Sequence, residues 1–180
     1  MARQSRRDAG ITALVLGFFA SAWFGWGHAA ASAGLSSWLT VGSVLALAVA
    51  AIGAVVGFRA PASTAALRDR AAGRRYGVIV GIEFGLAGLG AGILAAIDQP
   101  DYIPVWVCAV VGVHLIPLAS VLGDDRLVPL GVLVTIVALA ALIAGLTGTI
   151  APSTVTGVGA GLLLSGFAVA ELADAVPNKA

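Results

Sequence analysis

The chain has 180 residues, of which 59% are hydrophobic and only 11% are charged, and its formal net charge is +1. Soluble domains carry about 25% charged residues, so this composition excludes a soluble globular protein, and its hydrophobicity excludes a disordered one. The near-neutral charge excludes a basic nucleic-acid-binding face, and the single cysteine, Cys108, excludes a disulfide scaffold. We therefore expect the lipid bilayer, and not nucleic acid, to surround this chain.

Six apolar runs follow one another along the chain, separated by short polar breaks. Each run is continuously apolar and long enough to cross a bilayer as a helix, whereas barrel strands alternate apolar with polar residues. The sequence predicts an all-α, polytopic integral membrane protein, with one transmembrane domain over residues 1–180 built as a bundle of six helices. The predicted spans cover residues 10–27, 35–58, 77–97, 103–122, 128–148 and 155–173.

The ten basic residues all fall on one side of the membrane if there are six spans. They lie before the first span, between the second and third, and after the fourth and sixth, while the other three connections contain none. Cytoplasmic loops carry an excess of Lys and Arg, so both termini and the loop 59–76 are predicted to be cytoplasmic, in a multi-pass protein of the cell membrane. A wrong number of spans would scatter these charges over both faces.

The loop 59–76 is the only connection long enough to form structure of its own. Residues 65–72 are good helix formers, with Ser63 and Thr64 as the predicted start and Gly73 as the predicted end. We expect a short cytoplasmic surface helix there.

The N-terminal run has an alternative interpretation as a secretory signal peptide. It combines a basic stretch, an apolar run and small residues at 29–33, and its cleavage would leave five spans. The run is long for the apolar region of such a peptide and carries two Trp and three Phe, so a membrane span is the preferred interpretation.

The third span carries glycines at helical spacing. Drawn as a helix, it places five of them within an arc of about 80°, the pattern of small residues that lets membrane helices approach closely. Glu83 points roughly to the opposite side. Since neither a glycine stripe nor a carboxylate suits lipid, we expect this helix to be central to the bundle. The glycines of this predicted helix-packing stripe are Gly77, Gly81, Gly85, Gly88 and Gly92.

Carboxylates inside the spans are candidates for a functional site, because burying them in a membrane is costly. Glu83 lies about 9 Å inside the predicted cytoplasmic boundary and His114 about 12 Å, so the two are expected at a similar depth. Glu171, one turn before Asp174, lies near the same level. The hypothesis is that Glu83, His114 and Glu171 line one cytoplasm-facing cavity as binding or proton sites, with Asp174 close by. The alternative is a buried hydrogen bond that only joins two helices.

Cofactor chemistry is not indicated. Two histidines, a lone cysteine and no closely spaced cluster of ligand residues predict no metal site. The chain contains no nucleotide-binding or hydrolase motif, so no cofactor is expected.

Three classes of function remain open. The first expectation is a proton-linked transporter or permeation protein, acting as a homo-oligomer because six spans enclose little. The second is a membrane-embedded enzyme or binding protein for a lipid or isoprenoid-like substrate, in which Glu83 or Glu171 is the general acid and His114 its partner. The third is an accessory or assembly subunit of a membrane partner. A transporter should have pathways to both sides, an enzyme an apolar pocket at Glu83, and an accessory subunit a carboxylate satisfied by side chains alone.

Overall fold

A computed structural model describes residues 5–60 and 70–175, which are almost entirely helical. Each of the six long helices in these residues has the length and hydropathy needed to cross a bilayer, which confirms the all-helical chain with six apolar helices. Short 3-10 helices, η1 (His28–Ala30) and η4 (Pro100–Tyr102), lie in two of the connections. The long helices are α1 (Arg6–Gly27), α2 (Ala33–Arg59), α3 (Arg70–Ala96), α4 (Ile103–Leu122), α5 (Leu127–Thr147) and α6 (Pro152–Ala175).

The helices begin and end at residues suited to those positions. α1 follows Ser5, whose hydroxyl oxygen accepts a hydrogen bond from the Asp8 backbone N–H at 3.1 Å, and Ser32 caps α2 in the same way. Gly123 ends α4 and Gly148 ends α5 with φ angles of 67° and 66°. These are left-handed conformations that glycine adopts without strain, so the chain turns sharply there into the next helix.

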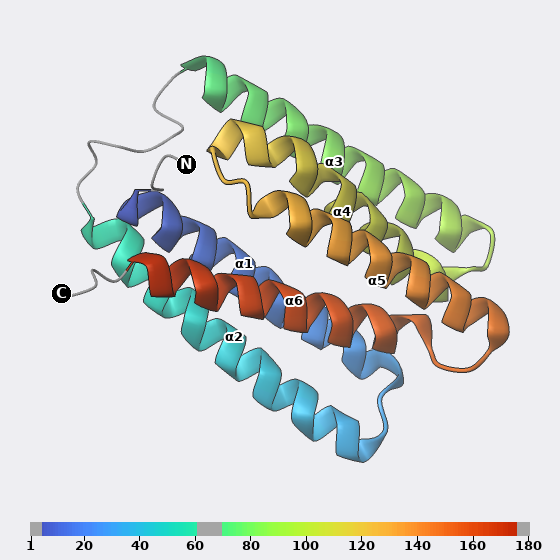
Figure 1. Ribbon diagram of the computed structural model, residues 1–180. Coiled ribbons are helices and arrows are strands. Elements are labelled where there is room, and N and C mark those ends of the chain that lie inside the picture. The colour runs from blue at the N-terminus through green and yellow to red at the C-terminus, as the bar shows by residue number, and fades with distance from the viewer. Residues whose placement is uncertain (1–4, 61–69, 176–180) are drawn as a thin grey trace.

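The helices form two groups of three that lie side by side (Figure 1). In the first group α1 packs against α2 and α6, and in the second α4 packs against α3 and α5. α5 and α6 also contact each other and join the groups. The start of α1 and the ends of α2 and α6 lie at the same end of the bundle as the start of α3 (Figure 1). We call this the basic end; the cations there whose side chains the structure describes are Arg6, Arg7, Arg59, Arg74, Arg75 and Arg126.

Glycines bring neighbouring helices into close contact within each group. A Cβ atom on Gly53 of α2 would lie 2.6 Å from the backbone nitrogen of Leu14 in α1. In the second group, a Cβ atom on Gly131 of α5 would lie 2.6 Å from the carbonyl oxygen of Gly112 in α4. Neither site has room for a methyl group, so the absence of a side chain sets the distance between these helices.

The predicted glycine stripe of α3 does not pack against another described helix of this chain. α3 lies at the edge of the bundle and packs mainly against α4, so the expectation that it is central was wrong. The physical reason is that α3 packs against α4 through a different face from the one that carries the glycine stripe. The Trp106 indole N–H of α4 donates to the Leu86 carbonyl oxygen at 2.9 Å, and its ring lies where a Cβ atom on Gly90 would be. Added Cβ atoms would meet nothing within 4 Å at Gly77, Gly81, Gly85, Gly88 and Gly92.

The predicted surface helix over 65–72 lies mostly outside the described residues. Its predicted end was wrong, because α3 begins at Arg70 and continues through Gly73. A glycine inside a helix costs only about 1 kcal/mol relative to alanine, and the apolar residues that follow continue the helix. Gly73 therefore does not act as a helix stop.

Candidate functional site

Glu83 of α3 and His114 of α4 meet inside the bundle. Oε2 of Glu83 lies 3.1 Å from Nε2 of His114, and the two side chains are 13% and 14% exposed. The sequence predicts a similar depth for the two residues, and they lie close together because α3 and α4 pack side by side. The face of α3 that carries the carboxylate is thus the face turned toward α4.

The other imidazole nitrogen fixes how this pair holds its proton. Nδ1 of His114 lies 2.8 Å from the carbonyl oxygen of Val111, one turn earlier in α4. A carbonyl oxygen only accepts, so Nδ1 carries a hydrogen and donates it. Nε2 and Oε2 then share one proton: either a carboxylic acid donates to a neutral imidazole, or an imidazolium donates to a carboxylate. Both arrangements have no net charge, which reduces the cost of burying the pair.

The pair lies on the wall of a pocket of about 400 Å³, which we call the Glu83 pocket. Its walls come mainly from α1, α3 and α4, with Leu127 of α5 and Leu164 of α6 completing them. Most of the lining side chains are apolar. The volume lies within the range of pockets that enclose small organic ligands.

The Glu83 pocket extends from the basic end to about the middle of the bundle. Arg7, Asp8 and Tyr76 line its basic end, and Phe19 is the deepest residue of α1 that lines it. Beyond that level, Trp23 and Phe24 of α1 are buried in the core, each 4% exposed. The described residues that line the pocket therefore reach from the basic end to about the middle of the bundle and no further.

The pocket also reaches the side of the bundle between α1 and α3. Phe19 of α1 and Phe84 of α3 line it and are 42% and 62% exposed. These two helices belong to different groups in Figure 1, so no tight helix contact closes this side. In a bilayer, a side opening bordered by phenylalanines would face the lipid chains.

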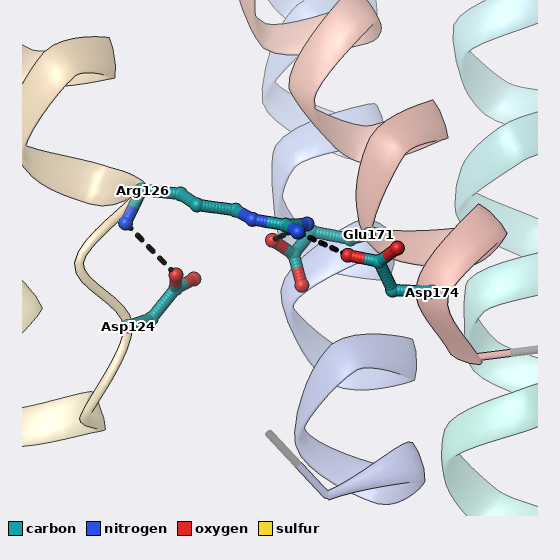
Figure 2. Close-up of polar contacts among 4 residues, drawn as sticks. All are labelled: Asp124, Arg126, Glu171 and Asp174. Atoms are coloured by element: carbon teal, nitrogen blue, oxygen red, sulfur yellow. Dashed lines mark hydrogen bonds and ion pairs between the residues drawn. The ribbon is translucent and has the colours of Figure 1, made fainter. Parts of the chain in front are cut away.

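Glu171 and Asp174 of α6 lie in a second polar cluster (Figure 2). Arg126, at the start of α5, reaches across to α6, where its Nη1 lies 3.4 Å from Oε1 of Glu171 and its Nη2 forms an ion pair with Asp174. The Arg126 backbone N–H donates to Asp124 Oδ1 at 3.1 Å. The hydrogen bond with Asp174 raises the pKa of Arg126 and outweighs partial desolvation, so this side chain stays a cation. The cluster connects the two helix groups at the basic end.

Glu171 does not line the Glu83 pocket, contrary to the expectation of one shared cavity. Its side chain is only 1% exposed, and Arg126 lies within ion-pair distance of it. A buried carboxylate is stabilised by a cation within reach, and Arg126 contacts Oε1 of Glu171, whereas Oε2 is buried without a hydrogen-bond partner among the described residues. From the sequence alone Arg126 is only a marker of sidedness, because a pairing between residues 45 positions apart leaves no local pattern.

Arg7 and Asp8 line the Glu83 pocket although the sequence analysis did not single them out. Arg7 belongs to a basic stretch next to a membrane span, and such stretches usually only set sidedness. Arg7 differs from Arg6 in the side of α1 on which it lies. Arg6 is exposed, whereas Arg7 turns toward the pocket.

Among the residues that the structure describes, no group of three or more His, Cys, Asp and Glu side chains could hold a metal ion. No protein-family model, curated protein or solved structure matches this chain.

Proposed function

We propose that this chain is a multi-pass membrane protein that binds a lipid or isoprenoid-like molecule in the Glu83 pocket, beside an acid–base pair formed by Glu83 and His114. The observation that carries the proposal is the position of the pair, on the wall of a mostly apolar pocket that reaches the side of the bundle. In this role Glu83 and His114 exchange their shared proton with a group on the bound molecule. The six apolar helices support the membrane setting.

The lining of the pocket favours such a ligand over a polar solute. A permeation path needs groups that interact with the solute toward both faces of the membrane. Here the polar side chains that line the pocket lie in the basic half. Toward the other end of α1, bulky side chains such as Trp23 and Phe24 are buried in the core. Proton-linked transport would use the same pair, but the geometry offers less support for it.

The accessory alternative is also less well supported. It expects a carboxylate that is satisfied entirely by neighbouring side chains and has no space around it. Glu83 does have a side-chain partner in His114, but it also borders a pocket large enough for a ligand. A purely structural hydrogen bond does not require such a cavity.

Photolabelling of the full-length chain in phosphatidylcholine nanodiscs tests the proposal. The probe is a long-chain alcohol that carries a diazirine in the middle of its chain, and mass spectrometry locates the labelled residues. We expect labelling at Phe19 and Phe84 that unlabelled alcohol competes away, because the pocket binds the chain at a saturable site. Labelling spread evenly over the lipid-facing surface and insensitive to competition would overturn the proposal.

A pair of variants on α3 provides the control. Val80 lines the pocket, whereas Val78 is 54% exposed and lies outside its lining. Val80→Trp should fill the pocket and abolish the competed labelling, and Val78→Trp should leave it unchanged. Equal labelling in both variants would also count against a ligand in the pocket.

A further inference from the structure

We infer that the ligand of the Glu83 pocket is a single-chain amphiphile with an anionic head group, a phosphate or a carboxylate, which Arg7 holds at the basic end. The inference rests on the proposed function, since it names the class of molecule that occupies the same pocket. The observation that carries it is Arg7, a cation on the wall of the pocket that has a hydrogen-bond donor without a partner among the described residues.

Arg7 lies in the first turn of α1 and lines the basic end of the pocket. Its Nε atom is buried and has no hydrogen-bond partner among the described residues. A buried donor on a charged group is costly without an acceptor, and a turn of the guanidinium toward an anion in the pocket would satisfy it. The planar guanidinium also matches phosphate and carboxylate groups, which it binds through two parallel hydrogen bonds.

Among the described residues that line this end of the pocket, Asp8 is the other charged one, and it takes part in the N-terminal cap of α1. The Ser5 hydroxyl donates to Oδ2 of Asp8 at 2.6 Å, and the Asp8 backbone N–H donates to the Ser5 hydroxyl oxygen at 3.1 Å. Negative charge is favoured at a helix N-terminus, whereas positive charge there is not. The helix N-terminus thus stabilises the negative charge of Asp8, whereas the positive charge of Arg7 would be stabilised by an anion from outside the chain.

The deeper polar groups do not compete with this preference for an anion. Glu83 and His114 share one proton and carry no net charge as a unit. Arg7 is therefore the group that selects the charge of the ligand. Tyr76 of α3 lines the same end of the pocket and offers a phenolic hydroxyl as a second donor.

The spacing along α3 places the rest of such a ligand. Tyr76 and Glu83 are seven residues apart, or about 10 Å along the helix axis. A head group at Arg7 and Tyr76 thus leads the attached chain past the acid–base pair, toward Phe19 and Phe84. A volume of about 400 Å³ suits a drug-sized molecule with one chain better than a phospholipid with two.

Competition against the diazirine probe in phosphatidylcholine nanodiscs tests the head group. The competitors are dodecyl phosphate, dodecanol and dodecylamine, which share one chain and differ in charge, together with inorganic phosphate. We expect dodecyl phosphate to compete at about tenfold lower concentration than dodecanol, because it adds a charge-assisted contact with Arg7. Dodecylamine should be the weakest of the three, and inorganic phosphate should not compete because it lacks the chain.

Arginine variants then assign the contact. Arg7→Gln should bring dodecyl phosphate to the level of dodecanol, and Arg7→Lys should keep part of the difference. Arg6→Gln removes the same charge from the adjacent, exposed position and should change nothing. Arg74 and Arg75 line a separate groove between α3 and α4, so a double change of both to Gln should also leave competition unchanged.

The outcomes separate this inference from the proposed function. Equal competition by the three amphiphiles on the wild-type chain overturns the anionic head group but leaves a lipid-like ligand in place. Because this comparison uses the wild-type chain, it tests the head group even if Arg7→Gln does not fold. Loss of the preference in Arg6→Gln or in the Arg74 and Arg75 double variant assigns the anion to the surface and overturns the role of Arg7. Failure of all three amphiphiles to compete overturns the proposed function itself.

Discussion

Nε2 of His114 and Oε2 of Glu83 lie 3.1 Å apart and share a single proton, because the Val111 carbonyl oxygen accepts the hydrogen on Nδ1. This relationship joins α3 to the rest of the bundle, since α3 packs mainly against α4. It also places a proton donor and acceptor beside a pocket. The pair can therefore serve stability and chemistry at once, and substitutions can separate the two.

Replacing Glu83 with Gln and with Ala should have different effects on stability. Glutamine keeps a side-chain donor toward Nε2 of His114, so Glu83→Gln should unfold close to the wild-type temperature. Glu83→Ala removes the partner of a mostly buried imidazole and should cost about 1–3 kcal/mol. The measurement is the temperature at which half of the detergent-solubilised protein leaves the monodisperse size-exclusion peak. Equal stability of the two variants would show that the hydrogen bond does not hold α3 in place.

The two kinds of glycine should respond oppositely to alanine. A methyl group on Gly53 would collide with the α1 backbone, so Gly53→Ala should lower the thermal stability. Gly81 faces open space, and Gly81→Ala should be neutral or stabilising by up to about 1 kcal/mol, because alanine is the better helix former. The same size-exclusion assay compares them.

The opposite result at Gly81 would have a specific meaning. A loss of stability on Gly81→Ala, together with a smaller mass in light scattering, would indicate that the stripe packs against a second copy of the chain. The predicted homo-oligomer would then use this face.

Span positions could be predicted from the sequence because hydropathy and length decide them one helix at a time. The predicted spans differ from the helices by only a few residues at most ends, and α3 is longer at its N-terminal end. The similar depth of Glu83 and His114 could also be predicted, since helices of similar tilt bring residues of similar depth to the same level. Hydropathy, length and depth are properties of each helix along the chain, so a single sequence is enough to predict them.

Which face of α3 turns inward could not be predicted in this way. Both faces have a reason to avoid lipid, one for its glycines and the other for its carboxylate. Partners on α4, namely His114 and Trp106, decide between them, and they act through contacts that only the fold creates. The same limit applies to Arg126, whose reach to Glu171 depends on how α5 lies against α6.

Loss of Arg126 should expose the cost of burying Glu171. Arg126→Gln leaves a carboxylate that is 1% exposed without its cation, and we expect a loss of about 2 kcal/mol. The double variant Arg126→Gln with Glu171→Gln should recover much of that loss, because the buried group is then neutral. Thermal unfolding of the two single variants and the double variant measures the coupling. Additive effects would show that the two side chains do not interact.

Asp174 provides the contrast within the same cluster. Its side chain is 57% exposed, so its ion pair with Arg126 is largely solvated. Asp174→Asn should therefore cost less than about 1 kcal/mol. An effect as large as that of Arg126→Gln would mean that Asp174, and not Glu171, is the important partner.

Cysteine labelling should place the basic end in the cytoplasm. Cys108 is fully buried, and its Sγ makes only a long contact of 3.5 Å with the Val134 carbonyl oxygen, so Cys108→Ala gives a cysteine-free background. Asp125→Cys then lies at the basic end and Asp98→Cys at the opposite end. An impermeant maleimide should label position 98 in intact cells and position 125 only in inverted vesicles, because Arg and Lys are retained on the cytoplasmic side. The reverse pattern would place the mouth of the Glu83 pocket outside the cell, and its ligand would then have to come from the outer leaflet.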